Sequence, residues 1–402
     1  MRGRAFRFFL LSGLLVFGAI RCTQWFVPSN VMRLERTAFA DIAGWGQSDP
    51  RSALAAFARS CAIESALADS ETMSGVYGGQ AGEWRAACAG SDAPAADAAS
   101  ARAFFQTRFV PYRIFSGGQP EGLFTGYYEP LLHGSRKKHG RFTTPLYGVP
   151  GDLVTADLGL FREALKGQHV TGRVQGGVLV PYATRAQIAR DGLAGKPLFY
   201  VDDPVDAFFL QIQGSGRIAL DDGTTVRAAF AGQNGQPYTA IGRVLVGRGA
   251  LSSDNVSMQS IRAWLEAHPQ EMQAVMDADA SYVFFAEKPV GDPSLGAEGA
   301  EGAALTAGVS LAADRSIHAL GAPVWVEAQG DDTSAAFARL MVMQDTGGAI
   351  RGAIRGDIYW GFGREAEVIA GTTKMTGRMI LFLPREIAER LGAHPQFSVP
   401  SP

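Results

Sequence analysis

The sequence has few of the residues that form metal sites or attract nucleic acids. It contains three cysteines and six histidines among 402 residues, and their spacing matches no zinc motif. The formal net charge is −2 and 19% of the residues are charged, so bulk charge would not attract nucleic acid. We therefore expect no metal, no cofactor and no nucleic-acid partner.

The N-terminus lacks a hydrophobic run long enough to span a bilayer comfortably. The run from Phe8 to Ile20 has thirteen apolar-biased residues, whereas a spanning helix needs about 20. Basic residues precede it at Arg2, Arg4 and Arg7, which predicts a signal peptide or membrane anchor within residues 1–28 rather than a buried helix. Cys22 follows, but Arg21 is large and charged where a lipid-attachment signal has a small residue. Cleavage, an uncleaved anchor and lipidation remain open.

Export would change how the two remaining cysteines are interpreted. In an oxidising compartment, Cys61 and Cys88 can form a disulfide. The alternative is that both are small buried hydrophobic residues on helices. The sequence does not decide between these two possibilities.

The pattern of apolar residues changes along the chain. Residues 30–110 are predicted to be helical, most clearly at 52–68 and 95–109. Residues 122–236 contain short β-branched or aromatic runs broken by Gly, Asp and Pro, and predict an all-β module. A helix interrupted by Pro269 is expected over residues 257–276. After a loop at 291–304, residues 305–384 have the pattern of a second β-rich unit.

An Asp-Thr-Gly sequence at Asp345 is what an aspartic protease contains. Such a protease needs two of these loops, so that two carboxyl groups share one proton, and this chain has one. A turn in which the Asp345 carboxylate accepts backbone N–H groups is the better interpretation. Asp314 precedes Arg315, which predicts an ion pair or a turn.

Asp357 differs from these two aspartates in its surroundings. It lies between a glycine and the aromatic sequence "IYWG". A carboxyl group at the start of an aromatic strand is partly desolvated, and desolvation raises its pKa. A raised pKa allows a carboxylic acid to donate a proton near neutral pH. Asp357 is therefore a candidate general acid, with a satisfied surface aspartate as the alternative.

Polar and aromatic residues that suit sugar binding are found earlier in the chain. Tyr127 and Tyr128 are adjacent on a predicted strand, so one is expected to be buried while the other lines a groove. Gln211 and Gln213 are expected on one face of a strand, followed by a turn at residues 214–216. This turn lacks the Gly-Lys-Ser/Thr ending of a phosphate loop.

Several separated stretches resemble the MltA family of lytic murein transglycosylases. They are "GLFTGYYEP" (122–130), "YATRAQI" (182–188), "FFLQIQGSGRI" (208–218), "PYTAIGRVLV" (237–246), "SYVFF" (281–285), "LTAGVSLAADRSIHALGAPVWVE" (305–327) and "QDTGGAIRGAIRGDIYWGFGREAEVIAG" (344–371). Together they cover most of residues 120–385 in a consistent order. The helical stretch before residue 110 adds little to the match.

The resemblance implies a mainly β fold with accessory helices and two domains. A double-psi β-barrel domain would comprise residues 30–125 and 245–402, and a smaller β domain would be inserted at 126–244, with a glycan groove between them. It also implies roles for individual residues. Asp357 would be the catalytic acid, Asp345 and Asp314 would support it, and the groove would be lined by Thr125, Tyr127, Tyr128, Gln213, Gly214 and Ser215.

The activity implied by the resemblance is exo-acting cleavage of peptidoglycan without water. The β-1,4 bond between N-acetylmuramic acid (MurNAc) and N-acetylglucosamine (GlcNAc) would break with formation of 1,6-anhydromuramic acid ends. The partners would be peptidoglycan strands and, through the N-terminus, a membrane, in the periplasm of a Gram-negative bacterium. A non-catalytic peptidoglycan-binding module and a hydrolytic muramidase are the alternatives, and the sequence does not settle exo or endo action.

Overall fold

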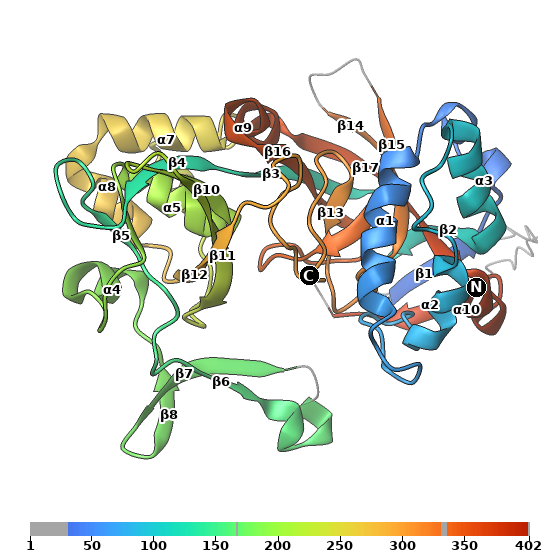
Figure 1. Cartoon of the computed structure of the whole chain (residues 1–402), viewed down its shortest axis with the longest axis horizontal. Coiled ribbons are helices and arrows are strands. Elements are labelled where there is room, and N and C mark those ends of the chain that lie inside the picture. Colours follow the sequence, from blue (N-terminus) through green and yellow to red (C-terminus); the bar gives the residue numbers. More distant parts are fainter. Residues whose placement is uncertain (1–30, 166–167, 331–335, 401–402) are drawn as a thin grey trace, which may run out of the picture.

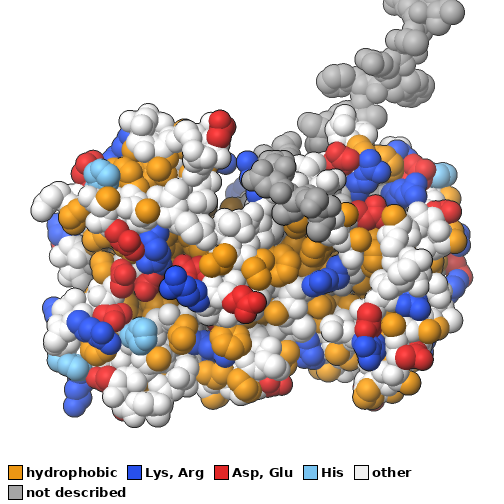
Figure 2. Space-filling model, turned by 90° about the horizontal axis from the view of Figure 1, so that it is seen from above, with side chains coloured by type: hydrophobic (Ala, Val, Ile, Leu, Met, Phe, Trp, Pro, Cys, Tyr) orange, Lys and Arg blue, Asp and Glu red, His pale blue; other side chains and the backbone are white. Residues whose placement is uncertain are grey.

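A computed structural model of the chain describes residues 31–165, 168–330 and 336–400. The predicted signal peptide or anchor and Cys22 lie outside these residues. The fold is mainly β with accessory helices, as predicted, and consists of two β units side by side (Figure 1). No helix in the described ranges is long and apolar enough to cross a membrane. Acidic and basic side chains are interspersed over the face shown in Figure 2, in keeping with the small net charge.

The first unit is a closed barrel of six strands. In order around the barrel they are β14 (Pro323–Gly330), β15 (Phe337–Asp345), β13 (Ser310–Ala312), β16 (Arg355–Phe362), β3 (Gly122–Glu129) and β17 (Lys374–Pro384). The barrel closes because β17 pairs with both β3 and β14. The pairs β13–β15 and β16–β3 are parallel and the others antiparallel, so this is a mixed barrel formed by chain segments far apart in sequence.

The far end of β17 extends the barrel into a sheet covered by helices. There it pairs with β2 (Phe109–Ser116), which continues through β1 (Val31–Arg36) to β18 (Gln396–Ser398). The helices of this unit are α1 (Arg51–Glu64), α2 (Ala81–Cys88), α3 (Ala98–Arg108), α9 (Gly363–Thr372) and α10 (Arg385–Leu391), with short 3-10 turns η1 (Phe39–Asp41) and η2 (Trp45–Gln47). Helices α1 and α3 confirm the predictions for residues 52–68 and 95–109. The prediction of helix from residue 30 was wrong at β1, whose alternate residues Met32 and Leu34 are buried.

The second unit is a six-stranded sheet packed against helices. Its strand order is β12 (Val283–Pro289), β11 (Thr225–Gln233), β10 (Gly216–Leu220), β4 (Leu131–Ser135), β9 (Phe199–Val201) and β5 (Thr144–Leu146). Its helices are α4 (Arg185–Asp191), α5 (Pro204–Gln213), α6 (Ile241–Gly247), α7 (Met258–Ala267) and α8 (Pro269–Met276). Pro269 separates α7 from α8, as predicted. The predicted domain limit at residue 244 separates β12 from the sheet with which it pairs, so strand pairing extends this unit to Pro289.

Helix α5 corrects the prediction that residues 122–236 are entirely β. Asp203 caps its N-terminus by accepting from two backbone N–H groups, Pro204 occupies the first turn, and Gly214 ends the helix with a φ of 84°. The helix is buried on several sides, so its apolar residues form a continuous run without a polar face. Periodicity alone cannot distinguish such a run from a buried strand, which is why the strand prediction was wrong.

A smaller three-stranded sheet extends from the second unit (Figure 1). It consists of β6 (Val154–Asp157), β7 (His169–Gln175) and β8 (Val178–Pro181), with 3-10 turns η3 (Leu158–Leu160) and η4 (Glu163–Leu165) beside it. The register places Val154, Val170, Val174 and Leu179 on one face, and all four are exposed.

The two units are joined by a buried group of charges where β3 leads into β4. Glu129, at the end of β3, accepts from Arg217 (3.0 Å) and Arg227 (2.5 Å), which lie on neighbouring strands of the second unit. The Arg217 guanidinium also lies 3.5 Å from the centre of the Phe362 ring on β16. Because all three charged groups are buried and paired, removing one would leave an uncompensated charge. This cluster fixes the second sheet against the barrel.

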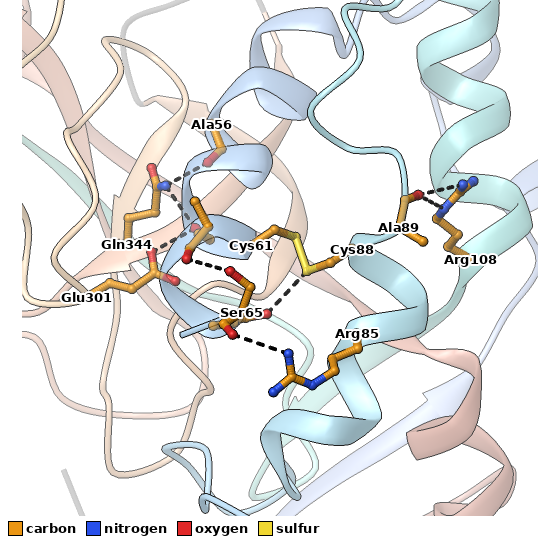
Figure 3. The surroundings of a disulfide bond; sticks show 12 residues. Ala56, Cys61, Ser65, Arg85, Cys88, Ala89, Arg108, Glu301 and Gln344 are labelled. Atoms are coloured by element: carbon orange, nitrogen blue, oxygen red, sulfur yellow. Dashed lines mark hydrogen bonds between the residues drawn. A yellow bond between two sulfur atoms is a disulfide. The ribbon is translucent and has the colours of Figure 1, made fainter. Parts of the chain in front are cut away.

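Cys61 on α1 and Cys88 on α2 form a disulfide, so the first of the two sequence-based interpretations is correct (Figure 3). Buried Glu64 lies beside the disulfide, and the charge of half-buried Glu301 reaches Glu64. Burial raises the pKa of Glu64 to about 8 and that of Glu301 to about 7. Glu301 accepts from Ser60, whose hydroxyl oxygen in turn accepts from the Gln344 side chain. Helix α1 thus contacts Gln344, the residue of β15 that directly precedes Asp345.

Candidate active site

The barrel topology brings the three sequence-predicted aspartates to adjacent strands. Asp345 ends β15, Asp314 follows β13, and Asp357 lies in β16, which pairs with β13. In the register, Ala312 of β13 is opposite both Asp345 and Asp357. The sequence separates these aspartates by up to 43 residues (357 − 314), and strand pairing brings them together.

Asp357 is partly exposed, although it lies deep among other protein atoms. Thr125 is opposite Asp357 in the parallel β16–β3 pair, and its hydroxyl donates to Asp357 Oδ1 at 2.5 Å. Burial raises the pKa of Asp357 to about 6, while the Thr125 hydrogen bond and the Arg355 charge oppose that rise and the Asp345 charge adds to it. A carboxyl group with this pKa can both donate and accept a proton near neutral pH.

Asp345 has the turn geometry that the Asp-Thr-Gly sequence predicted. Its Oδ1 accepts from the backbone N–H groups of Thr346 (2.9 Å) and Ala300 (3.0 Å). Its Oδ2 accepts from the Tyr127 hydroxyl at 2.8 Å. Burial raises the pKa of Asp345, and these three hydrogen bonds oppose the rise. Both carboxylate oxygens already have donors, so Asp345 is placed to hold the strand ends rather than to attack a substrate.

Asp314 is a buried anchor for the chain that leads to Asp357. Its carboxylate accepts from the Ser316 hydroxyl (2.6 Å) and from the backbone N–H groups of Ser316 and Gly352. Burial alone would raise the pKa of Asp314, but these hydrogen bonds outweigh it and lower the pKa. The predicted turn is confirmed. The arginine that lies near the carboxylate, at 3.4 Å, is Arg351 rather than the adjacent Arg315.

The two adjacent tyrosines point to opposite faces of β3, as predicted. The Tyr127 ring lies 5.3 Å from the Tyr359 ring and its hydroxyl reaches Asp345. Tyr128 is 3% exposed and packs against Ala366 and Ala370 of α9 (Gly363–Thr372). The predicted contact between the Tyr128 ring and a glycan is therefore wrong, because the ring is covered by this helix.

The predicted sugar-binding glutamines lie at the end of α5 rather than on a strand. Gln213 accepts from the backbone N–H of Tyr128 at 3.2 Å, which brings the end of this helix beside β3. Ser215 accepts from the backbone N–H of Phe230. Gln211 is buried and accepts from Arg185 at 2.8 Å, so the expectation that Gln211 and Gln213 share a sheet face was wrong.

Two residues near Asp357 were not predicted as site residues from the sequence. Tyr238, in the second unit, is 44% exposed, and its pKa is raised by burial and also by the charges of Asp279 and Asp357. Its hydroxyl is therefore within electrostatic reach of Asp357. Arg355 donates to the Thr125 hydroxyl oxygen at 2.9 Å. Its position two residues before Asp357 was a usable signal, because alternate strand residues share a face.

Comparisons with known proteins find family similarity over much of the chain. The MltA specific insert domain matches residues 123–286, and the 3D domain matches residues 309–383. The membrane-bound lytic murein transglycosylase A of Escherichia coli K12 is 33% identical over 264 residues, which are 64% of either chain. The chain thus spans just under two thirds of the length of this curated relative.

Two solved structures have the same fold. A membrane-bound lytic murein transglycosylase from Agrobacterium tumefaciens superimposes with a TM-score of 0.79 at 34% identity, covering 89% of this chain and 99% of that one. Escherichia coli MltA with bound chitohexaose superimposes with a TM-score of 0.63 at 27% identity, covering 83% and 90% of the two chains. The similarity therefore extends over both β units.

Proposed function

Because the chain belongs to the MltA family, we propose that it is a lytic transglycosylase that cleaves peptidoglycan glycan strands. The bond cleaved is the β-1,4 linkage between MurNAc and GlcNAc, and the product is a 1,6-anhydromuramic acid end. The observation that carries this proposal is Asp357, a partly exposed carboxylic acid with a pKa of about 6 whose charge reaches Tyr238 of the second unit. We further propose that the protein acts in the periplasm of a Gram-negative bacterium and is held to a membrane through its N-terminus.

Asp357 performs both proton transfers in this mechanism. Its neutral carboxyl protonates the glycosidic oxygen, and the bond from that oxygen to C1 of MurNAc breaks with development of an oxocarbenium-like species. The 6-hydroxyl of the same sugar attacks C1, and the Asp357 carboxylate takes the hydroxyl proton. A glycosidase that uses water needs a second carboxyl group. Here the nucleophile is already part of the substrate, so proximity replaces that group.

The residues around Asp357 support the two steps in different ways. Thr125 donates to Asp357 and stabilises the carboxylate formed after the first proton transfer. The hydrogen bond from the Tyr127 hydroxyl to Asp345 fixes both side chains near Asp357. We propose that Thr125, Tyr127 and the segment Gln213, Gly214 and Ser215 line the glycan groove, opposite Tyr238. Tyr128 supports this wall from behind through its contact with Gln213.

The rate of cleavage should depend on pH through the protonation of Asp357. The proposed acid must be neutral to act, so activity should fall as pH rises through about 6 rather than through the ordinary aspartate value of 3.8. Initial rates of turbidity loss of murein sacculi between pH 4 and pH 8 measure this, with circular dichroism to show that the fold is unchanged. Activity already lost by about pH 4 would exclude Asp357 as the acid.

Release of soluble fragments from purified sacculi tests the function itself. The enzyme should convert pelletable murein into soluble muropeptides with 1,6-anhydro ends, identified by mass spectrometry. A non-catalytic binding module would sediment with the sacculi and release nothing. That outcome would overturn the proposal even if binding were tight.

A further inference from the structure

Arg355 is a partly buried charge for which the described residues provide no ion pair. It lies on β16, is partly buried, and has no carboxylate within ion-pair distance anywhere in the described ranges. Its Nη1 donates to the backbone carbonyls of Gly356 (2.5 Å) and Leu123 (3.4 Å). Burial lowers the pKa of Arg355, and the charge that opposes this effect is Asp357. Removing a guanidinium from water costs free energy unless its charge is paired and hydrogen-bonded.

The remaining contact of Arg355 is with the catalytic acid's own hydrogen-bond partner. Its Nη2 donates to Thr125 Oγ1 at 2.9 Å, and the Thr125 hydroxyl donates to Asp357 Oδ1 at 2.5 Å. The register explains this geometry. Asp357 is opposite Thr125 in the parallel pair, while Arg355 is opposite Leu123 on the same strand and reaches diagonally. The three side chains form a chain from guanidinium to hydroxyl to carboxyl.

This chain fixes the direction of each hydrogen bond. A guanidinium can only donate, so Thr125 Oγ1 must accept from Arg355. The one hydroxyl proton of Thr125 is then directed to Asp357 Oδ1, which must accept it. Asp357 Oδ2 has no hydrogen-bond partner in the part of the chain that the structure describes, and it is not enclosed. When Asp357 is protonated, its proton is therefore directed to Oδ2, the oxygen that is open to solvent.

We propose that Arg355 is a positioning residue that, through Thr125, holds the acidic proton of Asp357 on the oxygen facing the substrate. The inference rests on the proposed function, which supplies the substrate. After proton donation, the same charge and the same hydroxyl stabilise the Asp357 carboxylate until the sugar hydroxyl returns a proton. Arg355 thus acts on both steps without touching the glycan.

Other groups also act on the charge of Asp357. Asp345 at the end of β15 opposes its ionisation, and Tyr127 on β3 and Tyr238 in the second unit interact with its negative charge. Arg355 is the cation of the set. Removing its charge should therefore raise the pKa of Asp357, by about one unit or more for an opposite charge at this range.

Substitution of Arg355 should produce two linked changes. In Arg355→Gln, the cleavage rate at pH 5 should fall by up to about ten-fold, because a weaker acid donates its proton more slowly. The loss of activity on the alkaline side should move to higher pH by about one unit, because the acid stays protonated longer. Arg355→Lys keeps the charge, so its alkaline limb should stay in place while the rate falls. If Arg355 were merely structural, Arg355→Gln would lower the rate without moving the alkaline limb.

Arg378→Gln is the matched control. Arg378 lies on β17, the other neighbour of β3, and pairs with Glu121 at the surface. It should leave both the rate and the pH profile unchanged. Thr125→Val should reproduce the loss of rate in Arg355→Gln, and Thr125→Ser should restore it. Thermal melting identifies any variant that is not folded.

A titration without substrate separates this proposal from the proposed function. Carboxyl ¹³C shifts of aspartate-labelled protein, with Asp357 assigned through Asp357→Asn, give its pKa in wild type and in Arg355→Gln. A higher pKa in the variant supports the inference even if murein is not cleaved. An unchanged pKa together with an unmoved alkaline limb in an active enzyme overturns it. Failure of the wild type to cleave murein would instead overturn the proposed function.

Discussion

Replacement of Asp357 by asparagine should reduce murein cleavage at least about a hundred-fold, because general acid catalysis contributes about 10²–10⁴-fold. The asparagine oxygen can still accept from Thr125, so the barrel should remain folded. The amide cannot deliver a proton to the glycosidic oxygen or take one from the 6-hydroxyl. Both steps of the proposed mechanism are lost together, which is why the effect should exceed that of any neighbouring substitution.

Binding should survive this substitution. Sedimentation with intact sacculi measures binding, and soluble muropeptides measured by chromatography give the rate. Asp254→Asn is the matched control, because Asp254 is an exposed aspartate in the loop between α6 and α7. It should leave both quantities unchanged. If Asp357→Asn retained a tenth or more of the wild-type rate, another group would have to be the acid.

Loss of the disulfide should have the largest effect on stability. The bond closes a separation of 27 residues between α1 and α2. Constraining a loop of this length in the unfolded chain contributes about 3 kcal/mol. The double substitution Cys61→Ala with Cys88→Ala should therefore lower the free energy of unfolding by about that amount. Urea denaturation followed by circular dichroism gives the value.

Reduction of the wild-type protein provides the control for this measurement. Addition of a reductant should destabilise the wild type and leave the double variant unchanged, which isolates the bond from the packing of the two side chains. Cys88 Sγ also lies 3.4 Å from the Glu64 carboxylate, so both side chains are part of a close-packed region. A loss below about 1 kcal/mol in the double variant would mean that the unfolded chain is already constrained there.

Local patterns predicted the elements that have a distinctive period or boundary. Residues 52–68 and 95–109 repeat at helical intervals, and both form helices. Pro269 separates two helices because its ring cannot continue the first one. The Asp-Thr-Gly turn was predictable for the same reason, since an aspartate before such a sequence caps its own backbone.

The errors occurred where the deciding contacts are distant in sequence. Strand β1 lies within a predominantly helical region, and its pairing partners β2 and β18 are far along the chain. Tyr128 is buried by α9, more than 200 residues away, which no local pattern could reveal. The contact between Arg355 and Thr125 depends on the register of β16 and β3, across 230 residues. Family resemblance supplied the proposed role of Asp357, whereas its hydrogen-bonded surroundings required the structure.

Digestion of murein in water enriched in the heavy oxygen isotope tests most directly whether Asp357 acts alone. If the sugar's own 6-hydroxyl is the nucleophile, the new muramic acid ends will be one water lighter than reducing ends and will contain no heavy oxygen. If a second group activates water, each new end will be a reducing sugar that contains one heavy oxygen atom. The first result is the one we expect, and the second would contradict a mechanism with a single acid at Asp357.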